Sequence, residues 1–139
     1  MPFQTEINAH IAELIFNKPP VNAFDSREWA AIAAELERLG ALDEVRVIVI
    51  RAEGKGFCAG VDIKELAADS SKIIAVNKGN YDTFAAIHRN RVPVIVALHG
   101  FVLGGGIGIG FFLRPVHAAC GKGERGNGDK KQVTHEDLS

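Results

Sequence analysis

The most regular hydrophobic pattern in the chain lies between residues 26 and 39. Asp25 stands three residues before Glu28, an arrangement typical of a capping box at a helix start. Gly40 interrupts the pattern, and glycine is typical of a helix end. We therefore predict a helix that begins after Asp25 and stops at Gly40. The apolar residues that repeat every three or four positions, as on one helix face, are Trp29, Ile32, Ala33, Leu36 and Leu39.

Two other segments consist almost entirely of apolar and β-branched residues. Residues 45–50 read VRVIVI and residues 92–98 read VPVIVAL, a composition typical of parallel strands that are covered on both faces. A partial apolar alternation over residues 5–16 predicts a further strand region, with a hairpin near Asn8.

Two more helices are expected between the two buried strands. Asp62 and Glu65 repeat the capping-box spacing, so a short helix should begin just after Val61. A longer helix is expected over residues 71–88, with one apolar face formed by Ile74, Tyr81 and Phe84. Strands that alternate with helices in this order predict an α/β fold with right-handed crossovers.

Residues 92–113 hold one ionisable side chain, His99, and are long enough to cross a bilayer as a helix. Six of these residues are glycines, and each glycine weakens a continuous helix by about 1 kcal/mol. A strand followed by a turn therefore fits the segment better, and a membrane span is the alternative.

Length, charge and cysteine content narrow the class of protein. The 139 residues correspond to one domain. Sixteen basic and 17 acidic residues give a formal net charge of −1, and no basic cluster indicates nucleic-acid binding. Cys58 and Cys120 form no CxxC pair, so neither a disulfide framework nor a metal site is expected. No secretory signal pattern is visible, and we expect a cytoplasmic protein.

The composition changes near Arg114. Residues 121–139 hold eight charged residues and four glycines but only one valine and one leucine, too few apolar side chains to build part of a core. We therefore expect a folded core over residues 1–113 and a disordered tail over residues 114–139.

A glycine-rich turn follows each of the two buried strands. Residues 53–62 follow the first strand and residues 99–106 follow the second. Parallel strands bring such turns to one edge of a sheet, where ligands bind in open α/β folds. Glycine lets a ligand approach backbone N–H groups closely, and two such groups side by side form an oxyanion hole. The sequence thus predicts an anion-stabilising site made by the backbone.

Other interpretations of the same residues stay open. The glycines can serve only to permit tight turns, and Asp62 can serve only as a helix N-cap. Gly54, Gly56 and Ala59 also match a relaxed dinucleotide-binding pattern after a strand, although position 74 lacks the acidic residue that this pattern requires.

Three segments together resemble the enoyl-CoA hydratase/isomerase (crotonase) family in order and spacing. They are NKPPVNAF at residues 17–24, RAEGKGFCAGVDIKEL at residues 51–66 and VPVIVALHGFVLGGGIGI at residues 92–109. The resemblance covers about residues 7–110. It implies a crotonase-like spiral core of ββα units, here incomplete, and an acyl-CoA thioester as substrate. Coenzyme A would enter as part of that substrate, with no permanently bound cofactor, and the family implies a homo-oligomer, either a trimer or a dimer of trimers.

The family holds the thioester oxygen with two backbone N–H groups, which the resemblance places on Val61 and Gly105. The resemblance therefore selects the same two turns as the hydrophobic pattern does. Asp62 is a third catalytic candidate. The positions that the resemblance implies for coenzyme A and thioester binding are Ala23, Ala59, Gly60, Val61, Asp62, Ile63, Gly104, Gly105 and Gly108.

The chain departs from the family's hydratases at both of their catalytic glutamates. One falls here on Gly108 and the other near Gly128, so isomerase, hydrolase or other lyase chemistry is expected in place of simple hydration. The carboxylates that could substitute are Asp62, Glu65 and Asp82. The family's continuation is absent after Ile109, and we expect a truncated or frame-shifted chain. The alternatives are an inactive remnant of the fold and a dinucleotide-binding module.

Overall fold

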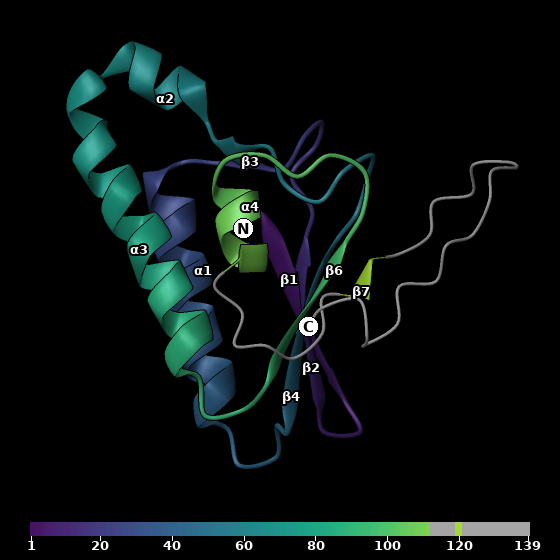
Figure 1. Ribbon diagram of the computed structural model, residues 1–139. Helices are drawn as coiled ribbons and strands as arrows, with labels where there is room; N and C mark the ends of the chain where they lie inside the picture. Colours follow the sequence, from purple (N-terminus) through teal and green to yellow (C-terminus); the bar gives the residue numbers. More distant parts are fainter. Residues whose placement is uncertain (112–118, 121–139) are drawn as a thin grey trace, which may run out of the picture.

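Figure 1 shows a computed structural model of the protein, in which residues 1–111 and 119–120 are described. Five strands form one sheet in the order β1-β2-β4-β6-β7, and β3 and β5 form a second, two-stranded sheet. The strands are β1 (Phe3–Asn8), β2 (Ile11–Phe16), β3 (Ala23–Phe24), β4 (Val47–Ala52), β5 (Gly60–Val61), β6 (Val94–Leu98) and β7 (Ala119–Cys120). The helices are α1 (Ser26–Ala41), α2 (Ile63–Ala68), the 3₁₀ turn η1 (Ser70–Lys72), α3 (Ile73–Arg89) and α4 (Gly105–Phe111).

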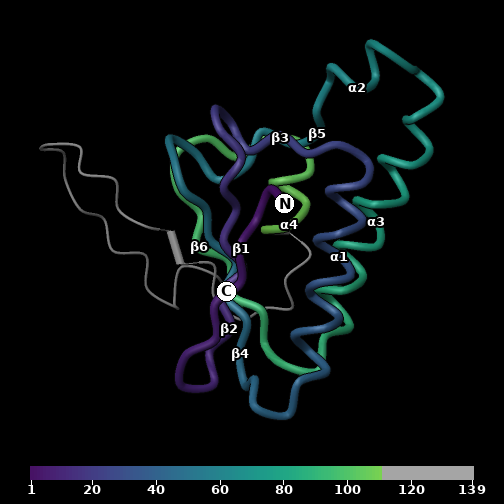
Figure 2. Tube along the Cα trace, turned by 180° about the vertical axis from the view of Figure 1, so that it is seen from behind, coloured from purple at the N-terminus to yellow at the C-terminus, as the bar shows by residue number. Residues whose placement is uncertain are grey.

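Helices α1 and α3 lie side by side on one face of the large sheet (Figure 1, Figure 2). Strand β1 runs antiparallel to β2, whereas β2, β4, β6 and β7 run parallel to one another. The expected α/β arrangement with a parallel sheet is therefore confirmed. The core between sheet and helices includes the fully buried side chains of Leu14, Phe16, Trp29, Ile32, Leu36, Ile48, Ile50 and Val96.

Two local predictions are confirmed at the start of the chain. Strands β1 and β2 form the expected hairpin, closed by Ala9 and His10, which both have positive φ, as tight hairpin turns require. Helix α1 begins with the expected capping box. Asp25 accepts a hydrogen bond from Glu28 N–H at 2.8 Å, and the Glu28 carboxylate accepts one from Asp25 N–H at 2.7 Å.

The prediction that α1 stops at Gly40 is wrong. The helix includes Gly40, ends at Ala41 and has Leu42 as its C-terminal cap. Gly40 is needed for space, because a Cβ there would lie only 2.3 Å from the Asn90 side-chain oxygen. Asn90 Nδ2 in turn donates to the Leu36 carbonyl at 2.9 Å, so this glycine lets the end of α3 dock on α1.

The expectation that the central strands are covered on both faces is also corrected. In β4, Ile48 and Ile50 are fully buried, whereas Val47 and Val49 are half-buried. The physical reason is that α1 and α3 cover a single face of the sheet within the described residues. Alternate side chains of a strand point to opposite faces, so every second residue of β4 remains partly exposed.

Helix α3 lies where expected but buries a different face. Ile74 is 76% exposed and Tyr81 63% exposed, whereas Phe84 packs partly buried against the core. The buried positions are Val76, Gly79, Thr83, Ala86 and Ile87. Small residues form the contact because the two helices approach closely: a Cβ on Gly79 would lie 2.8 Å from Trp29 Cβ. Apolar spacing alone does not reveal a helix contact made by glycine and threonine.

The alternative of a membrane span finds no support in the described part of the chain, where no helix is long and apolar enough to cross a bilayer. Over residues 92–111, the structure has strand β6, a turn and helix α4. Of the tail expected over residues 114–139, only Ala119 and Cys120 lie within the described residues, and they form β7. The rest of that prediction lies outside the described residues.

Candidate functional site

The two glycine-rich turns run alongside each other beyond the ends of β4 and β6. Phe57 N–H donates to the carbonyls of His99 at 2.9 Å and Phe101 at 3.0 Å. Cys58 forms a parallel bridge with Val102, and Leu103 N–H donates to the Cys58 carbonyl at 2.9 Å. The predicted meeting of the two turns at one edge of the sheet is therefore present in the structure.

The turns come closest where Gly60 faces Gly104 and Gly105. A Cβ built on Gly60 would lie 3.2 Å from Gly105 N and 3.4 Å from Gly104 Cα. Gly60 also has φ of +92°, a conformation that side chains rarely adopt. Glycine is thus required at this position for both conformation and space, and the two backbones are in direct contact.

The residues that follow Val61 and Gly105, namely Asp62 and Gly106, donate their N–H groups to backbone carbonyls. Asp62 N–H donates to Phe24 O at 2.8 Å across the β3–β5 pair. Since successive N–H groups of a strand point to opposite sides, we infer that Val61 N–H points away from β3. Gly106 N–H donates to Leu103 O at 2.9 Å, while Gly105 is the first residue of α4, where N–H groups have no acceptor within the helix.

The remaining predicted binding positions surround this contact. Ala23 pairs with Gly60 across the small sheet, and Ala59 N–H donates to the Val21 and Asn22 carbonyls at 3.1 and 3.2 Å. Ile63 begins α2 and is 75% exposed. These residues lie within or next to the two turns.

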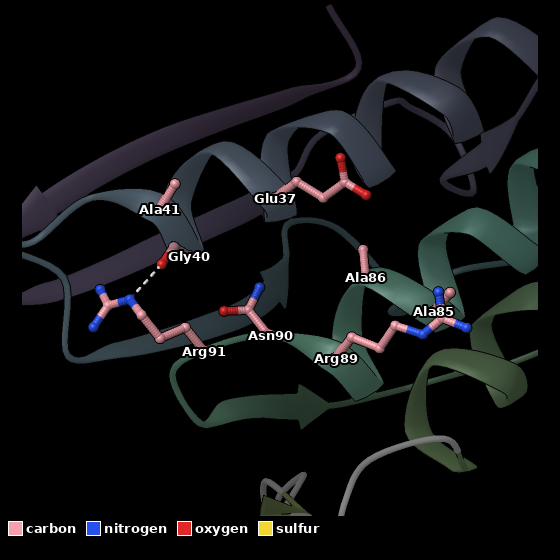
Figure 3. Close-up of a pocket in the computed structure, with 8 residues that line it drawn as sticks. All are labelled: Glu37, Gly40, Ala41, Ala85, Ala86, Arg89, Asn90 and Arg91. Atoms are coloured by element: carbon pink, nitrogen blue, oxygen red, sulfur yellow. Dashed lines mark hydrogen bonds between the residues drawn. The ribbon is translucent and has the colours of Figure 1, made fainter.

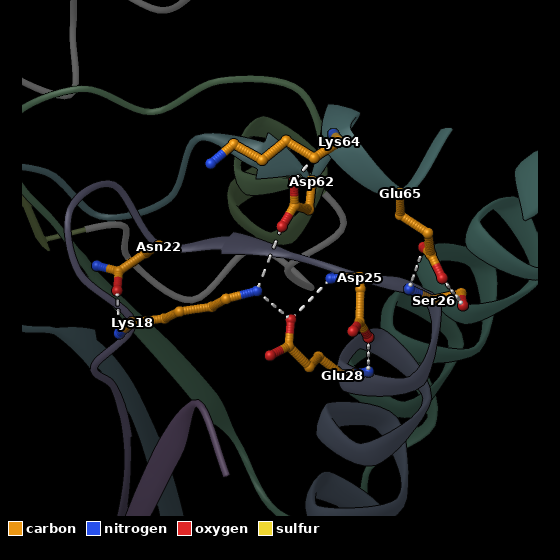
Figure 4. Close-up of polar contacts among 8 residues, drawn as sticks. All are labelled: Lys18, Asn22, Asp25, Ser26, Glu28, Asp62, Lys64 and Glu65. Atoms are coloured by element: carbon orange, nitrogen blue, oxygen red, sulfur yellow. Dashed lines mark hydrogen bonds and ion pairs between the residues drawn. The ribbon is translucent and has the colours of Figure 1, made fainter. Parts of the chain in front are cut away.

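Asp62 is tied into a polar network at the start of α1 (Figure 4). Its carboxylate caps α2 by accepting a hydrogen bond from Lys64 N–H at 3.0 Å. Lys18 Nζ lies 3.6 Å from Asp62 Oδ2 and 2.6 Å from Glu28 Oε2. Asp62 therefore acts as the N-cap of α2, as the alternative interpretation predicts.

The capping box predicted between Asp62 and Glu65 does not form. The Glu65 carboxylate reaches instead to α1, where it accepts hydrogen bonds from Ser26 N–H at 2.8 Å and from Ser26 Oγ at 2.7 Å (Figure 4). A negative charge is favourable at the N-terminus of a long helix, which explains why the carboxylate binds α1 rather than its own short helix. Asp82, the third candidate carboxylate, forms an ion pair with Lys78.

Gly108 faces an aromatic ring. A Cβ on Gly108 would lie 2.2 Å from Phe84 Cζ, so any side chain at this position would displace the ring. Gly105 is similarly enclosed, since a Cβ there would lie 2.5 Å from Asn80 Oδ1 and 2.6 Å from Trp29 Cζ2. Sequence reasoning missed Trp29 and Asn80 as site residues, although a run of glycines is a signal that larger groups pack against it.

Sequence reasoning also missed Asn22, which lies before β3 and contacts the first turn, and Cys58, which lies within that turn. Asn22 is buried with φ of +51°, and its Nδ2 donates to the carbonyls of Glu53 at 3.0 Å and Gly56 at 3.1 Å. Cys58 is fully buried, and its Sγ accepts a hydrogen bond from Gly60 N–H at 3.2 Å. Burial raises the pKa of the Cys58 thiol to about 11, so this thiol stays protonated and unreactive near neutral pH.

Residues 11–114, well over half of the chain, match the family model described as enoyl-CoA hydratase/isomerase. The chain belongs to the enoyl-CoA hydratase/isomerase family. The resemblance carried by the three sequence segments is thus confirmed.

Two curated relatives align with most of this chain but with less than half of their own length. A (7aS)-7a-methyl-1,5-dioxo-2,3,5,6,7,7a-hexahydro-1H-indene-carboxyl-CoA hydrolase of Mycobacterium tuberculosis is 42% identical over 101 residues, which are 71% of this chain and 41% of the relative. The peroxisomal Delta(3,5)-Delta(2,4)-dienoyl-CoA isomerase of Arabidopsis thaliana is 29% identical over 114 residues, 72% of this chain and 41% of the relative. The chain therefore spans less than half the length of these curated relatives.

Solved structures show the same fold. An enoyl-CoA hydratase/carnithine racemase of Magnetospirillum magneticum superposes with a TM-score of 0.73 at 24% identity, over 81% of this chain and 44% of that one. The expected α/β crotonase fold is confirmed over the part of the chain that the comparison covers.

A pocket of about 400 Å³ lies at the C-terminal ends of α1 and α3, away from the two glycine-rich turns (Figure 3). Arg91 lies at this pocket, but its guanidinium donates to the carbonyls of Gly40 at 2.8 Å and Leu42 at 2.7 Å. The arginine therefore caps the end of α1, and the pocket shares no lining residue with the glycine turns.

Proposed function

We propose that the protein binds an acyl-CoA thioester with its carbonyl oxygen between the N–H groups of Val61 and Gly105. The observation that carries the proposal is the direct backbone contact between Gly60 and the Gly104–Gly105 pair. It brings the two strand-terminal turns together without any intervening side chain. Family membership supports the same substrate class.

The chemistry follows from where negative charge grows. When a proton leaves the carbon next to a thioester, or when a nucleophile adds to the carbonyl, charge accumulates on the carbonyl oxygen. Fixed backbone donors stabilise that oxygen more than they stabilise the neutral ground state, and each such donor contributes about 3–4 kcal/mol. Coenzyme A arrives as part of the substrate, so the proposal requires no resident cofactor.

The reaction that we propose is not simple hydration. Position 108 carries no carboxylate, and Phe84 occupies the space that its side chain would need. Asp62 and Glu65 both hold other parts of the protein in place. Isomerase, hydrolase or other lyase chemistry is therefore proposed for the whole protein. Any catalytic acid or base would be a group other than Asp62 and Glu65.

For the acyl group we propose a fused-ring carboxylic acid rather than a short straight chain. The support is the 42% identity to the relative named as an indene-carboxyl-CoA hydrolase, compared with 29% to the dienoyl-CoA isomerase. Calorimetry that compares a fused-ring carboxyl-CoA with crotonyl-CoA tests this choice. Tighter binding of crotonyl-CoA would contradict it.

The donor assignment needs a test that adds no side chain, because a Cβ on Gly105 would collide with Trp29 and Asn80. Replacing the amide between Gly104 and Gly105 by an ester removes the Gly105 N–H without adding a side chain. It also weakens the Gly104 carbonyl as an acceptor for the N–H groups of Ile107 and Gly108. We expect this change to weaken binding of an acyl-CoA about 100-fold and to leave the affinity for free coenzyme A unchanged.

The matched control is the same ester substitution at Gly106, whose N–H donates to Leu103 within the turn. This variant loses a structural hydrogen bond of the same kind but keeps the proposed donor. Equal thioester affinities for the two ester variants would contradict the assignment of Gly105.

A further inference from the structure

Helix α1 touches both halves of the proposed site through one face of its first turn. Ser26 and Trp29 lie three positions apart, a spacing that places them on the same side of a helix. Ser26 is 7% exposed and Trp29 is fully buried. Ser26 contacts the segment that follows Val61, and Trp29 contacts Gly105 itself.

On the Val61 side, the link is the Glu65 carboxylate. It receives both the N–H and the hydroxyl of Ser26, at 2.8 and 2.7 Å. Helix α2 has no buried residue in the described structure, so little packing fixes it to the core. The paired hydrogen bonds to Ser26 therefore hold the start of α2, and with it the segment from Val61 onward.

On the Gly105 side, the link is the Trp29 ring. Its Cζ2 and Cη2 atoms lie 2.6 and 2.7 Å from the place a Gly105 Cβ would occupy. Phe24 packs edge-on against the same indole, with ring centroids 5.5 Å apart. Trp29 Nε1 has no hydrogen-bond partner among the described residues, so shape rather than polar bonding sets the position of the ring.

Helix α1 is itself held firmly at this point. Thr83 Oγ1 lies 3.1 Å from the Trp29 carbonyl oxygen and 2.9 Å from the Gly79 carbonyl oxygen. Helix α3 approaches so closely that a Gly79 Cβ would lie 2.8 Å from Trp29 Cβ and 3.4 Å from Ser26 O. The first turn of α1 is thus fixed to α3 independently of the two glycine turns. It can act as a rigid reference for both.

We propose that Ser26 and Trp29 are positioning residues that set the separation of the Val61 and Gly105 N–H groups. The inference rests on the proposed function, because it concerns the geometry of that same site. Donors of an oxyanion hole act only within about 2.7–3.1 Å of the oxygen, and a displacement of about 1 Å can reduce a rate about 100-fold. Neither residue touches the substrate in this account.

The test uses the full chain with Ser26→Ala and Trp29→Phe. We expect each variant to lower the affinity for an acyl-CoA about 10-fold relative to free coenzyme A, which lacks the carbonyl. A merely structural role would weaken both ligands alike and would overturn the proposal. In a Glu65→Ala background, which removes both acceptor oxygens, Ser26→Ala should have little further effect, whereas an undiminished effect would show that Glu65 is not the link.

Two control variants match these changes. Ser71→Ala removes a hydroxyl that donates to the Asp69 carboxylate at 2.6 Å on the exposed surface, and Ile32→Val removes a buried methyl group from α1. Both should keep the wild-type preference for the thioester over free coenzyme A. A loss of that preference in either control as large as in the Ser26 and Trp29 variants would overturn the proposal.

Amide NMR of the ligand-free variants tests positioning without any substrate. Ser26→Ala should shift the Val61 amide resonance more than that of Gly105, and Trp29→Phe should do the reverse. Unmoved amides would refute the positioning role even if the wild type binds thioesters. The variants can also shift the two amides as expected while the wild-type protein binds thioesters no better than free coenzyme A. That result would support the positioning role and refute the proposed function.

Discussion

The two glycine-rich turns meet at one site but are held in place by different forces. Polar side chains hold the first turn: Asn22 donates to the carbonyls of Glu53 and Gly56, and His99 Nε2 lies 3.0 Å from the Gly54 carbonyl oxygen. Packing holds the second turn and helix α4 that follows it, where Gly105 lies against Trp29 and Gly108 against Phe84. The first turn should therefore respond to the loss of single hydrogen bonds, and the second to added volume.

The largest effect is expected from Gly108→Glu in helix α4, which continues the second turn. The new side chain must displace the Phe84 ring, which lies 2.2 Å from its Cβ position, and it brings a carboxylate towards apolar surroundings. We expect a loss of about 3 kcal/mol or more in the free energy of unfolding, measured by urea denaturation. Phe84→Ala in the same chain should recover part of this loss, and a Gly108→Glu variant as stable as wild type would contradict the packing account.

An effect of about 2–3 kcal/mol is expected at alkaline pH from Cys58, the residue of the first turn that bridges to Val102 of the second. Burial raises the pKa of its thiol from 9.0 to about 11, so the folded state holds the proton more tightly than the unfolded chain. Stability is therefore unaffected below pH 9.0 and falls as the pH rises through about 11. Thermal denaturation across this range should show the decline, and the decline should be smaller in Cys58→Ala.

A smaller effect, about 2 kcal/mol, is expected from Asn22→Ala, which removes the side chain that holds the first turn. The change leaves the part-buried Glu53 carbonyl and the buried Gly56 carbonyl without this donor and places alanine at φ of +51°. Asn22→Gly is the matched control, since it loses the same hydrogen bonds but tolerates the backbone conformation. Chemical denaturation should rank wild type, Asn22→Gly and Asn22→Ala in decreasing order of stability, and an unchanged Asn22→Ala would refute the role of hydrogen bonds in this turn.

The smallest effect is expected from Lys18→Met, which removes the ammonium group between Glu28 and Asp62. Both ion pairs are partly exposed, so we expect a loss of no more than about 1 kcal/mol that shrinks as salt is added. A loss that is independent of salt would show that packing of the Lys18 chain, rather than charge, holds the start of α1 to α2.

How much the sequence reveals depends on how local each interaction is. The capping box of α1 joins residues three positions apart and was predicted, as were the glycine turns, because each directly follows an apolar strand. The bond between Ser26 and Glu65 spans 39 positions, and the same carboxylate also fits a local capping pattern, which misled the prediction.

The packed side of the site was harder to predict for a related reason. Nothing near Gly105 in the sequence indicates Trp29, which lies on another helix and looks like any core residue of α1. The contact face of α3 was predicted wrongly because Gly79 and Thr83, rather than the large apolar residues, meet α1. Contacts that depend on small residues leave no hydrophobic periodicity to detect.

The most direct test of the central claim is the vibrational spectrum of a bound thioester. An acyl-CoA labelled with ¹³C at the carbonyl carbon reports hydrogen bonding to the carbonyl oxygen through its stretching frequency. Two donors from Val61 and Gly105 should lower that frequency below its value in water, and the ester substitution at Gly105 should reverse part of the shift. A bound thioester with the same carbonyl frequency as in water would contradict the proposal that these two N–H groups form the site.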